Sequence, residues 1–200
     1  MVLSRMANSV NNGEVNMGNT AGNGEAPMEN TAGPRLGYAE NSPLNIKNTP
    51  FSTEDTPLSV ELAFQVEFYE VDSMEVVWHG NYVQYLERVR CALLDYVGYG
   101  YREMRASGFT FPVTHLSLKY IRPLHFGERV RAQATLEEYE NCLRIQYALF
   151  NAEGQLAAKG LSTQMAFEVA KNESCFVCPP ILIEKVRQLK ARLANGENHA

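Results

Sequence analysis

One carboxylate, Asp72, lies at the end of a predicted strand, and the chain enters a predicted helix shortly after it. The first backbone N–H groups of a helix have no partner within the helix and carry a partial positive charge, so they can polarise a carbonyl group. A carboxylate that faces such a helix start can activate a water molecule or attack an acyl carbon directly. The position of Asp72 is compatible with such chemistry, and a cap or turn role for the Asp is the alternative.

The elements on either side of this pair are indicated by hydrophobic periodicity. Apolar residues occupy every even position from Leu58 to Phe68, which predicts a half-buried strand. Residues 81–97 have apolar side chains in steps of three and four, which predicts a helix with one apolar face. Gly98 and Gly100 follow, and they predict that the helix ends there.

Strand patterns dominate the rest of the chain. They predict strands at 111–121, 130–136, 143–149 and 155–169, with a hairpin turn at 151–154. A last amphipathic helix is predicted after Pro179 and Pro180, with Ile181, Val186 and Leu189 on its apolar side. Because helices and strands do not alternate, the sequence favours an α+β fold in which an antiparallel sheet wraps around one long helix.

The first 56 residues differ in composition from the rest of the chain. They are rich in Asn, Gly, Glu and Pro, and residues 12–22 and 23–33 match at eight of eleven positions. Such a segment buries too little apolar surface to offset the entropy lost on ordering. We expect a disordered tail at 1–56 and a folded domain at 57–195.

Composition and charge limit the class of protein. The net charge of −5 argues against non-specific nucleic-acid binding, which requires a basic surface. No apolar run is long enough to span a membrane, and the first ten residues lack the apolar region of a secretory signal. The four cysteines are too sparse for a disulfide scaffold. We therefore expect a cytoplasmic protein.

The stretch at 69–90, YEVDSMEVVWHGNYVQYLERVR, resembles the signature of the 4-hydroxybenzoyl-CoA thioesterase family. It is most similar to the branch of the Tol-Pal-associated bacterial acyl-CoA thioesterases. The shared features are the Asp, the apolar residues after it, a His or Tyr, Asn-Tyr and a Glu-Arg pair. The stretch YIRPL at 120–124, followed by Gly127 and Glu128, resembles a second marker of the family. The resemblance runs from about residue 58 to residue 189.

This resemblance implies a hotdog fold, a dimer in which two subunits pair their sheets, and hydrolysis of acyl-CoA at the subunit interface. Asp72 matches the catalytic carboxylate, which acts as a general base or as a nucleophile. His79 matches the position whose backbone N–H polarises the thioester carbonyl. A homodimer or homotetramer is also expected because a single copy would leave a sheet edge open.

Substrate contacts are expected from the helix and from the strand that follows it. Trp78, Tyr82 and Tyr85 are predicted to line the acyl site, with core packing as the alternative for each. Arg122 is predicted to face the CoA phosphates, with a solvated surface position as its alternative. No metal or separate cofactor is expected, because CoA is part of the substrate and Cys175 and Cys178 form a lone C-x-x-C pair.

Two acidic residues carry open alternatives. Glu75 stands where the family often has Gly, and it either perturbs Asp72, restricts the pocket or points to solvent. Glu87, on the helix, is a second candidate acid, and a solvated or ion-paired Glu beside Arg88 is its alternative.

Two other functions also remain open. One is a hotdog enzyme acting on acyl-carrier-protein substrates, although the His-Phe-Pro signature of dehydratases is absent. The other is an acyl-binding protein without catalysis.

Overall fold

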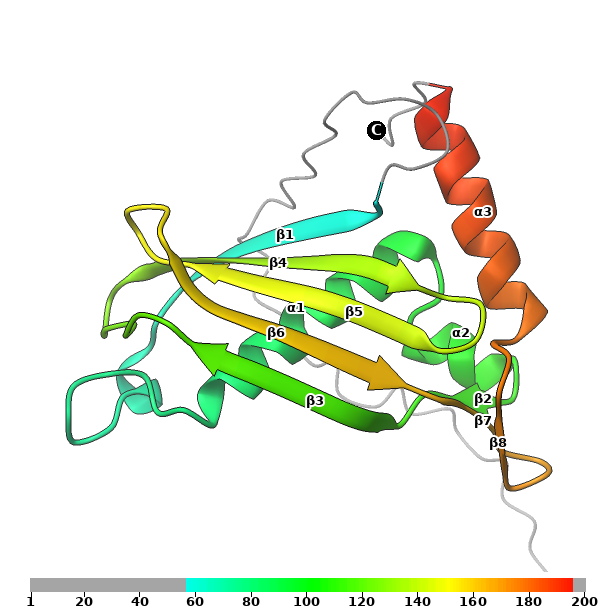
Figure 1. Ribbon diagram of the computed structural model, residues 1–200, viewed down its shortest axis with the longest axis horizontal. Helices are drawn as coiled ribbons and strands as arrows, with labels where there is room; N and C mark the ends of the chain where they lie inside the picture. Colours follow the sequence, from blue (N-terminus) through cyan, green and yellow to red (C-terminus); the bar gives the residue numbers. More distant parts are fainter. Residues whose placement is uncertain (1–56, 196–200) are drawn as a thin grey trace, which may run out of the picture. The chain divides into compact units, whose positions relative to one another are not determined.

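An antiparallel sheet and one long helix form the centre of the computed structural model, which describes residues 57–195 (Figure 1). The sheet has five strands in the order β1-β4-β5-β6-β3. The predicted tail at 1–56 lies outside the described residues. The strands are β1 (Ser59–Gln65), β3 (Val113–Tyr120), β4 (Arg129–Glu138), β5 (Leu143–Phe150) and β6 (Leu156–Gln164).

The long helix α1 (Asn81–Val97) confirms the predicted bounds. Its apolar side chains are buried against the sheet, where α1 contacts β1 and β4. The helix ends because Gly98 adopts a left-handed φ of 75°, a conformation that glycine reaches without steric cost. The Gly98 N–H then donates to the carbonyl of Asp95 over 2.9 Å, which satisfies one carbonyl of the last turn.

The inner strands follow the predicted alternation. Side chains at even positions of β4 and at odd positions of β5 point into the core and are buried. The hairpin turn between β5 and β6 also forms as predicted, since Asn151 and Gln155 are joined by a backbone hydrogen bond of 2.9 Å. The inward residues are Val130, Ala132, Ala134 and Leu136 on β4, and Leu143, Ile145, Tyr147 and Leu149 on β5.

Two predicted strands are corrected by the structure. Phe68 is 76% exposed and belongs to the short 3-10 helix η1 (Phe68–Glu70), because β1 already ends at Gln65. The strand predicted at 155–169 is interrupted at Met165, which separates β6 from β7 (Ala166–Glu168). A second, three-stranded sheet then forms from β7, β2 (Phe109–Thr110) and β8 (Glu173–Cys175). The short helix α2 (Tyr101–Ala106) was not predicted.

The last helix, α3 (Pro180–Ala194), begins at a proline. Proline is tolerated in the first helical turn because a backbone N–H there would have no acceptor within the helix. Leu182, Val186 and Leu189 are its buried side chains. Ile181 is 43% exposed, so the predicted apolar side is shifted by one residue at its start. Among the helices of the described part, none has both the length and the hydrophobicity needed to cross a bilayer.

Strand β3 lies at an edge of the larger sheet and is mostly exposed. It pairs with β6 on one side, and no strand within residues 57–195 pairs with its other side. Val113, Leu116 and Tyr120 on this strand are 46%, 39% and 47% exposed. An open strand edge with apolar side chains is a surface suited to pairing with a further strand.

Candidate functional site

The chain between η1 and α1 folds back on itself as a short hairpin (Figure 1). Asp72 lies on one arm of this hairpin. At its base, the backbone N–H of Trp78 donates to the carbonyl of Glu70 over 2.9 Å. Nearer the tip, the N–H of Asp72 donates to the carbonyl of Val76, also over 2.9 Å. These bonds hold Asp72 on one arm of the hairpin and the approach to α1 on the other.

The connection between β3 and β4 supports this hairpin from the side. The N–H of Val77 donates to the carbonyl of Leu124 over 2.8 Å, and Val76 forms a β-bridge with His125. The Nδ1 atom of His125 also lies 3.2 Å from the carbonyl oxygen of Glu75. The hairpin is therefore attached to the sheet as well as to the helix.

The Asp72 carboxylate is oriented by its own turn. Its Oδ1 atom accepts a hydrogen bond of 2.8 Å from the N–H of Met74, an Asx-turn contact. The next residue, Glu75, donates its N–H to the carbonyl of Asp72 and has a left-handed φ of 61°. This conformation favours glycine. The Glu75 side chain is exposed, which is the solvent-facing alternative.

The start of α1 offers a backbone donor at His79. The carbonyl of Trp78 accepts the N–H of Asn81 over 2.9 Å, which fixes the peptide group between Trp78 and His79. Because C=O and N–H point in opposite directions in a trans peptide, the His79 N–H points away from the helix body. In the part of the chain that the structure describes, no protein group accepts a hydrogen bond from it.

The side chain of His79 is exposed and lies beside the Trp78 ring, with ring centroids 4.9 Å apart. Among the described residues, no hydrogen-bond partner of the imidazole is present. The backbone carbonyl of His79 instead accepts the hydroxyl of Tyr120, at the end of β3, over 3.0 Å. The backbone at this residue is therefore held more firmly than its ring.

Trp78 is 48% exposed and lies over the backbone of Gly80. A Cβ atom at position 80 would come within 2.1 Å of the Trp78 ring. Position 80 therefore requires a residue without a side chain as long as the ring keeps this place.

The two tyrosines predicted to line the acyl site lie in the core. Tyr82 is 3% exposed and Tyr85 has no exposed surface, so neither can contact a ligand in this conformation. The Tyr85 hydroxyl donates to Oε2 of Glu70 over 2.8 Å. Burial raises the pKa of Tyr82 to about 12, and burial together with the Glu70 carboxylate raises the pKa of Tyr85. Core packing, the stated alternative, describes both residues.

Arg122 lies on the surface two residues beyond Tyr120. Its Nη1 atom donates to the carbonyl of Leu156 over 2.7 Å. This bond orients the guanidinium group at the end of β3, while the side chain stays exposed.

Glu87 forms an ion pair, as expected if it is not the catalytic acid, but its partner is not the neighbouring Arg88. It pairs with Arg90 and accepts the hydroxyl of Tyr101 over 2.6 Å. Burial alone would raise the pKa of Glu87, but the hydrogen bonds from Tyr101 and Arg90 outweigh burial and hold it below its usual value. Arg88, the partner expected from the sequence, instead lies over the ring of Phe64 at 4.2 Å.

Glu70 is a site residue that the sequence did not single out. It is only 7% exposed although it is acidic, and it lies two positions before Asp72. The one local signal is its spacing of three from Glu67, which resembles the reciprocal capping pair at a helix start. Its partner on α1 could not be identified from the sequence, because that contact depends on how the hairpin folds back.

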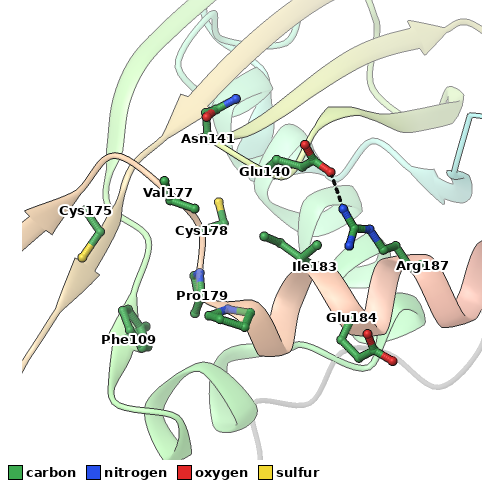
Figure 2. Close-up of a pocket in the computed structure, with 11 residues that line it drawn as sticks. Phe109, Glu140, Asn141, Cys175, Val177, Cys178, Pro179, Ile183, Glu184 and Arg187 are labelled. Atoms are coloured by element: carbon green, nitrogen blue, oxygen red, sulfur yellow. Dashed lines mark hydrogen bonds and ion pairs between the residues drawn. The ribbon is translucent and has the colours of Figure 1, made fainter.

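A pocket of about 550 Å³ lies elsewhere, between β8, the start of α3 and the connection from β4 to β5 (Figure 2). Cys175 and Cys178 both line it, and Figure 2 shows their side chains pointing in different directions. Burial raises the pKa of Cys178 to about 12, so this thiol is protonated and unreactive at neutral pH. No residue of the Asp72 hairpin lines this pocket. Within residues 57–195, no cluster of three metal-ligating side chains is present.

Comparison with known proteins relates this chain to a family of enzymes. The sequence profile of the Thioesterase-like superfamily matches residues 66–187, which include the hairpin and all of α1. The chain is 30% identical over 105 residues to YneP of Bacillus subtilis, whose name describes it provisionally as an acyl-CoA thioesterase. That alignment covers 52% of this chain and 76% of YneP.

Solved structures show the same architecture. A DHNA-CoA thioesterase from Staphylococcus aureus superposes with a TM-score of 0.59 at 24% identity, covering 70% of this chain and 97% of its own. A hypothetical protein from Thermus thermophilus superposes with a TM-score of 0.58 at 29% identity, covering 64% and 98%. The hotdog fold expected from the sequence is thereby confirmed.

Proposed function

The chain belongs to the Thioesterase-like superfamily, and on this premise we propose that it hydrolyses acyl-CoA thioesters to a free acid and CoA. One observation carries the proposal: Asp72 lies on a hairpin whose base is bonded to the start of α1, where the His79 N–H has no protein acceptor. The similarity to YneP supports the same activity. The proposed catalytic unit is 57–195, and membership of the 4-hydroxybenzoyl-CoA branch stays a prediction.

The proposed reaction uses the helix start as an electrophilic site. The thioester carbonyl oxygen accepts a hydrogen bond from the His79 N–H, which stabilises the negative charge that develops there. Asp72 either removes a proton from the attacking water or attacks the carbonyl carbon itself. In the second route, water cleaves the resulting anhydride and restores the carboxylate. In both routes the C–S bond breaks, and the sulfur leaves with CoA.

Trp78 and Arg122 are the proposed substrate contacts on this chain. The Trp78 ring is half exposed beside His79, where the reacting end of the substrate would lie. The exposed guanidinium of Arg122 provides positive charge for the CoA phosphates. Tyr82 and Tyr85 support these residues from the core. Because CoA is part of the substrate, the proposed reaction needs no separate cofactor.

The exposed β3 edge supports a homodimer, or a tetramer built from such dimers. Pairing of β3 with the β3 of a second copy would cover the exposed side chains of Val113 and Leu116. We expect light scattering to give at least twice the mass of one chain, 22.4 kDa. Leu116→Lys should shift the protein towards the monomer, because the two positive charges would oppose pairing across the edge.

The proposed function is tested by release of CoA, followed with a thiol reagent, on acetyl-, butyryl-, palmitoyl- and benzoyl-CoA. Asp72→Asn should lower kcat by about 10²–10⁴-fold on any ester that the wild type cleaves. Glu75→Gln is the matched control, since it removes an exposed carboxylate from the same hairpin. Full activity of Asp72→Asn would contradict the assignment.

Absence of turnover on every ester, from folded wild-type protein, would contradict acyl-CoA hydrolysis. The same panel on acyl-carrier-protein thioesters would then distinguish a different carrier from a protein that only binds acyl groups. Binding of an acyl-CoA that is unaffected by Asp72→Asn would favour the second of these.

A further inference from the structure

Glu70 holds a carboxylate in the core next to the candidate site. The side chain is 7% exposed, and no Lys, Arg or His of the described residues forms an ion pair with it. Its Oε2 atom accepts two hydrogen bonds of 2.8 Å, from the hydroxyl of Tyr85 and from the N–H of Glu67. Burial of an acidic group without a cation is unfavourable unless its hydrogen bonds are well formed. A largely buried glutamate without a cation is therefore expected to have a specific structural role.

The backbone carbonyl of the same residue makes two further bonds. It accepts the N–H of Trp78 over 2.9 Å and the side-chain amide of Asn81 over 2.8 Å. Trp78 closes the base of the hairpin, and Asn81 is the first residue of α1. Through its side chain Glu70 also reaches Tyr85, one turn further along α1. One residue thus connects both arms of the hairpin to the helix.

These bonds lie on both sides of the proposed reacting groups. Asp72 follows Glu70 by two residues, and His79 follows Trp78 by one. A shift of Glu70 relative to α1 would therefore change the separation between the Asp72 carboxylate and the His79 N–H. A misplacement of about 1 Å between reacting groups can lower a rate by about 10²-fold.

We propose that Glu70 is a positioning residue, which sets the separation of Asp72 and the His79 N–H through its bonds to Tyr85, Asn81 and Trp78. The proposal rests on the proposed function, because it gives Glu70 a part in the same reaction. Glu70 is not proposed to act on the substrate itself, since it is largely buried and its Oε2 atom is already bonded to Tyr85 and to the N–H of Glu67.

The first test removes one bond without altering the packing. Tyr85→Phe deletes the donor to Glu70 and keeps the ring that packs against Phe64 at 4.7 Å. The matched control is Tyr99→Phe, because Tyr99 is equally buried and its hydroxyl is bonded to Ser107 at 2.7 Å, on the far end of α1. Tyr85→Phe should lower kcat by about 3–10-fold with KM within about twofold, and Tyr99→Phe should leave both within about twofold.

The second test compares two replacements of Glu70 itself. Glu70→Gln keeps an acceptor oxygen for Tyr85 and Glu67, so kcat should stay within about threefold of wild type. Glu70→Leu keeps the volume but removes the acceptor, and it should lower kcat by about 10²-fold. Recovery of activity by the glutamine variant separates positioning through hydrogen bonds from a need for negative charge.

Hydrogen–deuterium exchange gives a readout that does not depend on activity. The backbone N–H groups of residues 70–81 should exchange faster in Tyr85→Phe and Glu70→Leu, but not in Tyr99→Phe or Glu70→Gln. The proposal is overturned if Tyr85→Phe keeps the wild-type kcat or if its exchange in 70–81 is unchanged. Tyr85→Phe decides alone if Glu70→Leu does not fold. If the wild type cleaves no thioester, the proposed function fails, and the exchange result alone decides whether Glu70 holds the hairpin.

Discussion

The hydroxyl of Tyr120 donates a hydrogen bond of 3.0 Å to the backbone carbonyl of His79, 41 positions earlier in the chain. This bond joins the end of the edge strand β3 to the start of α1. The rings of Tyr120 and Tyr82 also pack in a T-shaped arrangement, with centroids 5.0 Å apart and ring planes at 86°. The backbone that carries the proposed donor is thus held by the helix on one side and by the sheet on the other.

Tyr120→Phe should lower kcat by about 3–10-fold, because the peptide after His79 would lose its anchor on β3. The ring contact with Tyr82 would remain, so the melting temperature should change little. Steady-state rates on the best ester of the panel measure the effect. Tyr96→Phe, on the half-buried side of α1, is the control. Equal rates for the two variants would show that the Tyr120 hydroxyl does not support the site.

His79→Ala should lower kcat by less than about threefold if the backbone N–H is the donor. A side-chain donor to the oxyanion would cost about 10²–10³-fold. We expect the first outcome because the imidazole is exposed and, among residues 57–195, only the Trp78 ring is in contact with it. A loss of 10²-fold in the folded variant would assign the role to the ring.

Gly80→Ala should displace the Trp78 ring, since the new Cβ would lie 2.1 Å from it. Trp78 is the single tryptophan of the chain, so intrinsic fluorescence reports the movement directly. We expect a shifted emission maximum together with a fall in kcat of about tenfold or more. An unchanged spectrum with full activity would show that the structure accommodates the new methyl group without displacing the Trp78 ring from its environment.

Glu75→Gly should stabilise the protein by about 0.5–1 kcal/mol. A left-handed φ costs a residue with a side chain about 1–2 kcal/mol, and glycine avoids this cost. Glycine also makes the unfolded chain more flexible, which offsets part of the stabilisation. Urea unfolding of the two proteins measures the difference. Asn172, with a φ of 56°, is the matched control, because asparagine tolerates this region and Asn172→Gly should gain little.

Glu87→Gln should reduce stability at pH 7 by about 0.2–1 kcal/mol, the range of a half-exposed ion pair. Because the pKa of Glu87 is held below its ordinary value of 4.5, the stabilising contribution is present above that pH and is lost as the pH falls through the lowered pKa. The difference between wild type and variant should therefore disappear in acid. Urea unfolding from pH 7 to pH 3 tests this, with Glu153→Gln in an exposed turn as control.

Much of the fold could be predicted because periodicity reports burial directly. The bounds of α1 and the alternation in β4 and β5 depend on which face meets the core, and that preference is local. Phe68 and Ile181 were misplaced because each lies next to an element end, where the chain turns and the period no longer applies. The strand break at Met165 depends on a second sheet that forms only after the chain folds.

The site was predicted in part. Asp72 and the start of α1 were predicted as site residues from residue type, spacing and family resemblance, and their roles stay predictions. Burial of Tyr82 and Tyr85 could not be separated from pocket lining, because an apolar stripe on a helix serves either purpose. The role proposed for Glu70 could not be predicted from the sequence, since a glutamate near several other acidic residues ordinarily faces solvent.

The hydrogen bonds of Glu70 join residues that are at most 15 positions apart in the chain. These short separations favour early formation of the bonds that Glu70 makes, whereas the bonds of the hairpin to Leu124 and His125 can form only when the distant β3–β4 connection has reached it. Substitutions in the distant strands should therefore disturb the bonds of Glu70 less than substitutions within residues 67–85, which contain every partner of these bonds.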